Sequence, residues 1–359
     1  MKKILALVLA TLMIATLVAG CASEPATDAP STDAPASDAP ADDAAPADDA
    51  AEGDLPTIGV CIYKYDDTYI STVRQALEAA AEGKANLILN DGKGDQATQN
   101  DQIDLLIEKG VDVLLVNMVD IGAAQTVVDK IKAADIPVIF FNREPDAEVL
   151  KTYDKARFVG TNAKDAGVIQ GEIIAEMWAA DPALDKNGDG TMQYVMFQGE
   201  PNNPEAIART EWSVKTAEEK GVKTEQLELQ IANWDTELAY QAMESWLSKH
   251  GDSIEFVIAN NDGMAQGAVN ALIAAGYNTG EEGAKVVPVV GVDATDAAKE
   301  LIGAGKMSGT VLQDGPGMAN AIFALAMNVA GGKDYLDGTD YQYDDTGIAV
   351  RIPYQAYKG

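Results

Sequence analysis

Apolar runs recur along the chain from residue 58, and most of them precede a stretch with the apolar spacing of a helix. The run Ile58–Tyr63 precedes Tyr69–Ala81, in which Ile70, Val73 and Leu77 fall on one helical face. The other predicted strands are Val113–Val116, Pro137–Phe141, Phe158–Gly160, Tyr194–Phe197, Leu227–Ile231, Phe256–Ala259, Val286–Val292 and Gly309–Leu312. The other predicted helices are Ala123–Ala133, one beginning at Ala206, Thr236–Lys249, Met264–Ala275, Ala294–Ile302 and Met318–Val329. Strands this uniformly apolar are buried on both faces, and their number exceeds one compact sheet, so we predict an α/β fold of two doubly wound domains with parallel sheets.

Polar side chains stand just past the carboxyl ends of many predicted strands. They are Asp67, Asn117, Asn142, Asn261, Asp293, and Gln313 with Asp314. Open α/β sheets bind ligands at this edge, although each residue alone is equally well explained as a helix N-cap. The chain has neither a basic cluster nor a glycine-rich phosphate loop. The set therefore indicates a neutral, polyhydroxylated ligand, whose hydroxyl groups carboxylates and carboxamides can bind.

Charge and composition exclude several classes of protein. The 359 residues include 26 Lys and Arg against 57 Asp and Glu, a net charge of −31, which argues against a nucleic-acid partner. The single histidine, His250, excludes a metal centre built from several histidines. Only two cysteines are present, Cys21 and Cys61. Cys61 lies in an apolar run and is expected to be a buried thiol rather than half of a disulfide.

Two N-terminal segments are predicted to precede the folded part. In residues 1–21, two lysines are followed by the apolar run Ile4–Val18, which is short for a membrane span and typical of a signal peptide. This segment ends in Leu17–Cys21, which resembles the lipobox of bacterial lipoproteins, where the cysteine is lipid-modified and becomes the N-terminus. The alternative is an ordinary signal peptide with an incidental cysteine. Residues 22–56, with ten acidic and no basic residues among Ala and Pro, predict a disordered acidic tether.

A segment beginning at Asp185 has the spacing of a calcium-binding loop. Side-chain oxygens stand at its first, third, fifth and ninth positions, which are Asp185, Asn187, Asp189 and Gln193. Gly190 permits the turn at the sixth position, and Thr191 at the seventh would contribute its backbone carbonyl. The twelfth position is Met196 instead of Glu, and a strand follows where an EF-hand has a helix. A distant carboxylate would have to complete the calcium shell; the alternative is a polar turn without a metal.

Seven short motifs of the folded part form a characteristic set, namely Tyr63–Asp67, Gln99–Asp104, Phe140–Pro145, Tyr153–Ala156, Ile258–Asp262, Gly291–Ala294 and Gly309–Leu312. Together they resemble those of the periplasmic galactose/glucose-binding proteins of bacterial sugar ABC transporters. The resemblance runs from about Thr57 to the C-terminus and implies the periplasmic-binding-protein type I fold, in which two Rossmann-like domains are joined by a three-segment hinge. It implies an N-terminal lobe of residues 57–137 plus about 314–348, and a C-terminal lobe of residues 138–313 plus about 349–359.

The resemblance also implies a hexose site in the cleft. The implied sugar-binding residues are Asp67, Tyr69, Asn117, Asn203, Glu205, Arg209, Trp234, Asn261, Asp293 and Gln313. Asp67 would bind the hydroxyl whose configuration separates glucose from galactose, and Tyr69 and Trp234 would stack on the two sugar faces. For Trp234 the alternative is a place in the core. In the calcium loop, the resemblance implies that Glu255 completes the shell.

Three residues depart from the pattern of that family. The family's His-Pro-Asp segment reads Asn203-Pro204-Glu205 here, and a cleft Asn of the family is Gln313. Glu205 and Gln313 are each longer by one methylene than the residues they replace, which a close-fitting sugar pocket should register. The identity of the hexose or hexoside therefore stays open.

The sequence as a whole predicts a non-enzymatic, lipid-anchored solute-binding protein on the extracytoplasmic face of the cell membrane. It would bind galactose, glucose or a galactoside by hinge closure, use a calcium ion, act as a monomer and deliver sugar to the permease of an ABC importer. The alternatives are a glycosidase that uses Asp67 and Asp293, a sugar-responsive repressor, a sensor or chemoreceptor ligand carrier, and the same fold with another sugar. The absence of a basic helix-turn-helix weighs against the repressor.

Overall fold

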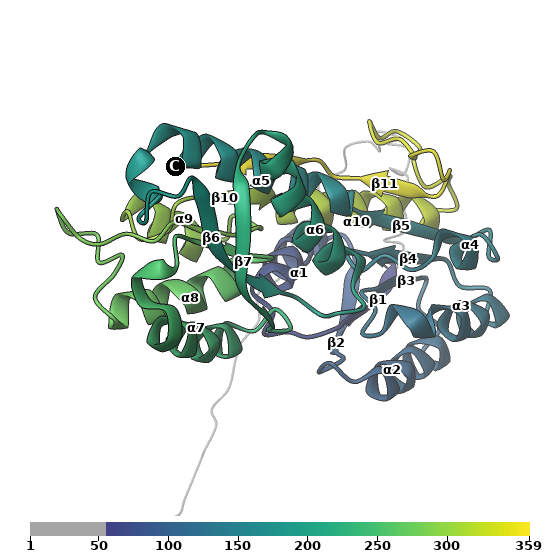
Figure 1. The fold of residues 1–359 in the computed structure, drawn as a ribbon. Coiled ribbons are helices and arrows are strands. Elements are labelled where there is room, and N and C mark those ends of the chain that lie inside the picture. The colour runs from purple at the N-terminus through teal and green to yellow at the C-terminus, as the bar shows by residue number, and fades with distance from the viewer. Residues whose placement is uncertain (1–54) are drawn as a thin grey trace, which may run out of the picture. The chain divides into compact units, whose positions relative to one another are not determined.

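The computed structural model describes residues 55–359. Cys21, the predicted signal peptide and all but the last two residues of the predicted tether lie outside this range. The described chain forms two lobes, each a parallel sheet covered by helices (Figure 1). The prediction of an α/β fold with parallel sheets in two domains is thus confirmed. Within residues 55–359, no helix is long and apolar enough to cross a membrane.

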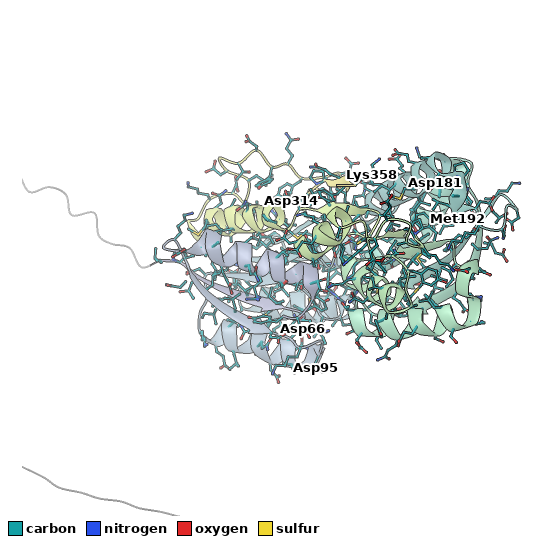
Figure 2. All side chains as sticks on the ribbon, turned by 90° about the vertical axis from the view of Figure 1, so that its left-hand side faces the viewer. Asp66, Asp95, Asp181, Met192, Asp314 and Lys358 are labelled. Atoms are coloured by element: carbon teal, nitrogen blue, oxygen red, sulfur yellow. The ribbon has the colours of Figure 1, made fainter. Side chains whose placement is uncertain are left out.

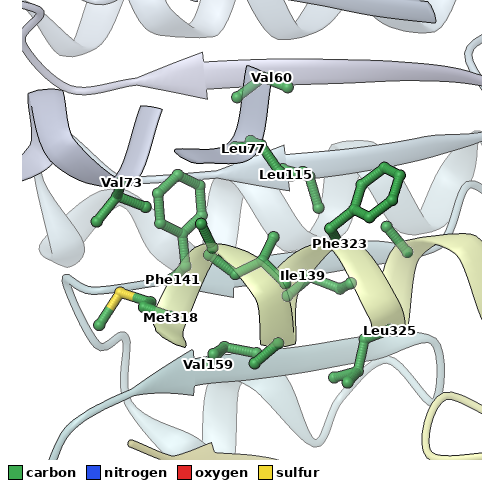
Figure 3. Packing of buried hydrophobic residues seen from close by; sticks show 14 of the residues in the cluster. Val60, Val73, Leu77, Leu115, Ile139, Phe141, Val159, Met318, Phe323 and Leu325 are labelled. Atoms are coloured by element: carbon green, nitrogen blue, oxygen red, sulfur yellow. The ribbon is translucent and has the colours of Figure 1, made fainter. Parts of the chain in front are cut away.

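The N-terminal lobe is built on a six-stranded sheet with the strand order β11-β5-β4-β3-β1-β2. Its strands, parallel throughout, are β1 (Thr57–Ile62), β2 (Asn86–Asp91), β3 (Val113–Val116), β4 (Val138–Phe141), β5 (Ala156–Gly160) and β11 (Ala349–Arg351). Its helices are α1 (Thr68–Ala81), α2 (Gln96–Glu108), η1 (Ile121–Ala123), α3 (Ala124–Ala133), α4 (Ala147–Leu150) and α10 (Gly315–Ala330). Helices α1 and α10 pack on one face of the sheet, as Figure 3 shows for Val73, Leu77 and Met318. Helices α2 and α3 cover the other face, so neighbouring residues of a strand, such as Leu114 and Leu115, enter different cores.

The C-terminal lobe has a parallel sheet in the order β7-β6-β8-β9. These strands are β6 (Thr191–Gln198), β7 (Lys223–Ile231), β8 (Phe256–Ala259) and β9 (Val289–Val290). An antiparallel pair, β10 (Thr310–Gln313) and β12 (Tyr354–Tyr357), joins the sheet through the bridges Val290–Gly309 and Asp293–Leu312. The helices are α5 (Ala163–Ala180), η2 (Pro182–Leu184), α6 (Pro204–Glu219), α7 (Thr236–His250), η3 (Gly251–Ser253), α8 (Asp262–Ala274) and α9 (Asp296–Gly303).

The chain passes between the lobes three times, after β5, after β10 and after β11. The predicted lobe boundary at 137/138 is therefore wrong, because β4 pairs with β3 and β5 pairs with β4 in the first sheet. Residues 349–351 were also predicted in the C-terminal lobe, but β11 pairs with β5. The physical reason for both errors is that an apolar strand buried on both faces has the same composition in either sheet. Only its hydrogen-bonding neighbour assigns it to a lobe.

Several regular elements were not predicted, among them β2, α2 and α5. β2 is the edge strand of its sheet and is partly exposed along its length, so it lacks the continuous apolar run of the other strands. Helix α2 buries only Gln99, Ile103 and Leu106, a weak helical pattern. Helix α5 carries glycines on its buried face, which an apolar periodicity does not detect.

Glycine allows the two helices on one face of the C-terminal sheet, α7 and α8, to touch through their backbones. A Cβ on Gly267 of α8 would lie 2.2 Å from the carbonyl oxygen of Thr236 and 3.0 Å from the backbone nitrogen of Tyr240, both in α7. Neither atom is the end of a flexible side chain. The spacing of α7 and α8 therefore requires glycine at position 267.

We expect Gly267→Ala to lower the free energy of unfolding by about 1–3 kcal/mol, because α7 must shift to admit the methyl group. This is the reverse of helix propensity, which favours Ala over Gly by roughly 1 kcal/mol. Gly303→Ala at the end of α9 is the matched control, since a Cβ there meets nothing within 4 Å, and it should be neutral or slightly stabilising. Urea denaturation measures both. A Gly267→Ala protein as stable as the wild type would contradict the close α7–α8 contact.

Candidate functional site

A narrow chamber lies between the lobes at the carboxyl ends of both sheets. It is lined by Tyr63, Asp67, Tyr69, Asn142, Arg143, Asn203, Glu205, Arg209, Trp234, Asn261, Asp293 and Gln313. The free space within it is about 40 Å³, whereas a single water needs roughly 10–15 Å³. A ligand much larger than a few waters can therefore enter only if the lobes separate or the side chains move.

Several lining residues begin helices, and their capping bonds fix where their side chains point. Asp67 caps α1 by accepting the N–H of Ile70 at 2.7 Å through Oδ1, and its Oδ2 accepts the hydroxyl of Tyr63 at 2.6 Å. Asn261 caps α8 and Asn203 caps α6 in the same way. The two explanations for polar residues at strand ends are thus compatible, because a cap uses one oxygen and leaves the rest of the group near the ligand edge.

Arg209 is the buried cation of the chamber. Its Nη1 donates to the carbonyl oxygen of Asn260 at 2.8 Å, and its Nη2 donates to Gln313 Oε1 at 2.9 Å. Its nearest carboxylates are those of Glu205, at 3.2 Å, and Asp293, at 3.8 Å. Burial alone would lower the pKa of Arg209, but Tyr354 and these two acids outweigh it and raise the pKa, so the side chain stays charged.

Asp293 carries the most perturbed carboxylate of the site. Burial raises its pKa well above the usual range, while the charge of Arg209 opposes that shift. Its backbone is held at a φ of 131° as the chain leaves the sheet. The position lies in the left-handed region that favours glycine, so the fold holds this side chain in place at a conformational cost.

Four buried polar atoms of residues that line the chamber lack a hydrogen-bond partner within residues 55–359. Asp293 Oδ2, Arg209 Nε and Gln313 Nε2 belong to the C-terminal lobe, and Arg143 Nε follows β4 of the N-terminal lobe. Leaving such an atom unpaired costs about 1–3 kcal/mol, so native proteins normally satisfy it. The one acceptor and two donors of the C-terminal lobe match the hydroxyl groups of a polyol, each of which can both donate and accept.

The chamber has aromatic walls from both lobes. Tyr69 comes from the first turn of α1, and Trp234 from the loop after β7. Asn233 and Trp234 have φ values of 50° and 67°, and the indole lies so close to Gly199 that a Cβ there would be 2.3 Å from the ring. Trp234 is therefore a loop residue of the chamber rather than a core residue.

Asn117 is not brought to the chamber. It is fully buried, accepts the N–H of Tyr63 at 3.2 Å and donates to the carbonyl oxygen of Phe141 at 3.1 Å. Asn117 thus does not line the chamber, and its predicted contact with the ligand stays a prediction. Its amide instead connects the ends of β1 and β4, because these strands flank β3 in the sheet.

Three residues of the chamber were missing from the predicted set: Tyr63, Asn142 and Arg143. Asn142 stands directly after β4 and was already among the polar residues at strand ends. Arg143 lies with its guanidinium 4.4 Å from the ring centroid of Tyr63 and pairs with Glu200 of the other lobe. The signal for these residues was their place in two of the family-like motifs, Tyr63–Asp67 for Tyr63 and Phe140–Pro145 for Asn142 and Arg143.

The predicted calcium loop folds around its own carboxylates. Both oxygens of Asp185 accept backbone N–H groups, from Gly188 at 2.8 Å and Gly190 at 2.9 Å. The buried Glu255, just before β8, accepts the N–H of Lys186 at 2.6 Å and that of Gln193 at 3.0 Å. Glu255, although distant in the sequence, is therefore held against the loop.

The donor set of this loop has the chemistry of a hard-cation site, with carboxylate, amide and carbonyl oxygens only. Asp189 Oδ2 accepts the amide nitrogens of Asn187 and Gln193, each at 3.0 Å. If each of these amide groups were rotated by 180°, its oxygen would stand where its nitrogen now lies, beside Asp189 Oδ2. Within residues 55–359, no three Asp, Glu, Cys or His side chains form a metal-binding group by themselves, so amide and backbone oxygens would have to complete the shell.

A second buried acid, Asp262, stands beside the chamber at the start of α8. It accepts the hydroxyl of Thr310 at 2.6 Å and the N–H of Thr295 at 2.8 Å. Burial raises the pKa of Asp262 to about 6, although both hydrogen bonds oppose the shift. The carboxyl is also close enough to Asp293 to raise the pKa of that residue.

Comparisons with known proteins agree with this geometry. The model of the family described as periplasmic binding protein domain matches residues 58–334. The chain is 43% identical over 300 residues, 83% of its length and 88% of the relative, to the D-galactose/methyl-galactoside binding periplasmic protein MglB of Haemophilus influenzae. It is 30% identical over 288 residues, 79% of its length and 75% of the relative, to a xylitol-binding protein of Mycolicibacterium smegmatis. Among solved structures, it is similar to an ABC transporter solute binding protein from Bacillus halodurans with bound myo-inositol, with a TM-score of 0.69, 29% identity, and coverage of 85% of this chain and 94% of that one.

The raised pKa of Asp262 predicts a pH-dependent contribution to stability. Between the unfolded pKa of about 3.9 and the folded pKa of about 6, the folded state binds more protons, so the contribution of this group falls as pH rises. Asp262→Asn removes the titration, keeps one oxygen that can accept the N–H of Thr295, and can donate its amide N–H to the hydroxyl oxygen of Thr310. We expect the unfolding free energy of the variant, relative to the wild type, to rise by about 2–3 kcal/mol between pH 4 and 7. Urea denaturation at several pH values measures it, with the exposed Asp296→Asn as the matched control. A difference that stays constant with pH would contradict the assignment.

Proposed function

The chain belongs to the periplasmic binding protein family and is a sugar-binding component of an ABC transporter, and we propose that its ligand is a hexose, namely galactose, glucose or a galactoside. Its relatives are binding proteins of transport systems and not enzymes. The family places the protein on the extracytoplasmic side of the membrane, with a permease as its partner. The observation that carries the hexose proposal is the chamber with aromatic walls, in which the C-terminal lobe presents one unpartnered acceptor and two unpartnered donors.

Each part of the chamber has a role in this proposal. Asp293, Arg209 and Gln313 bind ring hydroxyls through their unpartnered atoms, and Asn261 and Asn203 add amide donors. Trp234 and Tyr69 cover the apolar C–H faces of the ring. Asp67, oriented by the hydroxyl of Tyr63, reads the hydroxyl that separates glucose from galactose.

The relative that binds D-galactose and methyl-galactoside supports the choice among hexoses. Asn203, Glu205 and Gln313 reshape one side of the chamber relative to the sugar-binding proteins that the sequence resembles. Binding to a panel of galactose, glucose and their methyl glycosides, measured by calorimetry, tests the choice directly.

Hinge closure is the mechanism we propose for binding. The chamber is lined from both lobes and has little free space, so the sugar must enter an open form and be enclosed as the lobes approach. A sugar that bonds to both lobes favours the closed form by its extra contacts there, and the permease then recognises that form. We propose that the protein acts as a monomer, because this mechanism needs no second subunit.

We propose a calcium ion in the Asp185 loop. Asp185, Asn187, Asp189, Gln193 and Glu255 would supply side-chain oxygens, and Thr191 would supply its carbonyl oxygen. The contacts of Glu255 with the backbone of Lys186 and Gln193 support this proposal. The ion would fix the connection between η2 and β6 and take no part in the sugar chamber.

A lipid anchor at Cys21 is also proposed, on the resemblance of Leu17–Cys21 to a lipobox. The wild-type protein should incorporate labelled palmitate, and the Cys21→Ala variant should not. A wild-type protein that stays unlabelled would rule the anchor out.

We expect Asp293→Ala to weaken hexose binding by about 2–5 kcal/mol, because one side of a buried charged hydrogen bond is lost. Asp66→Ala is the matched control, since Asp66 is an exposed carboxylate next to Asp67 that does not line the chamber (Figure 2). Calorimetry gives the affinities, and the fluorescence of Trp234 should respond to sugar in the control and in the wild type. Equal affinities of Asp293→Ala and the wild type would place the ligand elsewhere.

Removal of calcium should lower the melting temperature, because the ion binds the folded loop only; an ion at 100 times its Kd adds about 2.7 kcal/mol. Chelator should not lower the melting temperature of Asp189→Ala further, and hexose affinity should change little in either protein. Asp181→Ala, an exposed acid at the start of η2 (Figure 2), is the control and should respond to chelator like the wild type. A wild-type melting curve that chelator leaves unchanged would contradict the calcium site.

A further inference from the structure

The three segments that connect the lobes meet at one turn of helix α6. Thr161 belongs to the first segment, between β5 and α5. Gln313 ends β10 at the second segment, and Tyr354 begins β12 after the third. The side chains of all three reach Glu205 or Arg209, which are one turn apart on α6.

Glu205 is the residue to which the first and third segments are tied. Its Oε1 accepts the hydroxyl of Thr161 at 2.7 Å, and its Oε2 accepts the hydroxyl of Tyr354 at 3.0 Å. Arg209 Nη2 donates to the same Tyr354 oxygen at 2.8 Å. Because each hydroxyl has one proton, Thr161 and Tyr354 can both donate to Glu205 while Tyr354 accepts from Arg209. The bonds form one consistent network.

The network is shielded from water, so its bonds hold firmly. Thr161 and Tyr354 are buried, and the side chains of Arg209 and Glu205 are 4% and 13% exposed. Both oxygens of Glu205 are engaged with the connecting segments, whereas Asp293 keeps one oxygen without a partner. Glu205 thus lines the chamber but directs its carboxylate at the hinge. The extra methylene relative to an aspartate gives it the length to do so.

We propose that Glu205 and Tyr354 are positioning residues that fasten the three connecting segments to α6 and so fix both the closed angle of the lobes and the place of Arg209 in the chamber. The inference rests on the proposed function, since Arg209 matters for binding only if the chamber holds a sugar. The hydroxyl of Tyr354 then influences both the sugar affinity and the angle between the lobes. Removal of that hydroxyl should affect the angle as well as the affinity, whereas removal of a ligand-binding group should affect the affinity alone.

The test measures lobe separation as well as binding, in the full chain. Spin labels on Glu108→Cys of α2 and Ser248→Cys of α7, both exposed, report the distance between lobes in a Cys21→Ser background. Tyr354→Phe should weaken hexose binding roughly tenfold, the value of one lost hydrogen bond, and broaden the distance distribution with and without saturating hexose. Tyr357→Phe on the same strand, whose hydroxyl makes no side-chain hydrogen bond within residues 55–359, should behave as the wild type.

Further variants separate a hinge role from loss of contact or of folding. Asp293→Ala, saturated with hexose, should keep the wild-type distance distribution despite weaker binding. Glu205→Asp should broaden the distribution more than Glu205→Gln, which keeps the side-chain length, and Thr161→Val gives a second reading should Tyr354→Phe fold poorly. A Tyr354→Phe distribution equal to that of Tyr357→Phe overturns the inference, as do equal widths for the two Glu205 variants. If no hexose binds even to the wild type, the proposed function fails, while the unliganded distributions still decide the hinge role.

Discussion

The charge of Arg209 has to be kept in a place that water does not reach, and much of the ligand site is organised around that requirement. A buried guanidinium is tolerated only when its donors and its charge are satisfied by the protein. Here the partners come from the end of a strand, from a helix turn and from two of the connections between lobes. Two acids, Asp262 and Asp293, are buried nearby, and burial raises the pKa of both, while the charge of Asp262 adds to the rise at Asp293.

Helix capping and ligand binding use the same residues because of the geometry of a parallel sheet. Each strand delivers its next residue to one edge, and each following helix needs a cap at that edge. Asp67 caps α1 and Asn261 caps α8, and the two residues line the chamber from opposite lobes. In a site built in this way, the residues of each lobe are fixed relative to one another, and the site changes shape only when the lobes move.

The sequence was sufficient for the fold class and for nine of the chamber residues, because strand ends, helix periodicity and family-like motifs are all local signals. It was insufficient where a long-range neighbour decides the outcome. β4, β5 and β11 were assigned to the wrong lobe because an apolar strand does not reveal its partner strand. Asn117 has the same local context as Asn142, yet only Asn142 lines the chamber, since Asn117 is bonded to the ends of β1 and β4. The weak helix α2 and the edge strand β2 were missed because packing rather than composition stabilises them.

The free thiol of Cys61 is fully buried in β1, between β3 and β2 of the first sheet, and burial raises its pKa to about 12. At neutral pH almost none of it is thiolate, which is the form that reacts with oxidants and disulfides. In an oxidising compartment outside the cytoplasm, a free cysteine is normally a hazard, because it can pair with another protein. Buried in this strand, Cys61 can remain reduced for the life of the folded protein without any enzyme to protect it.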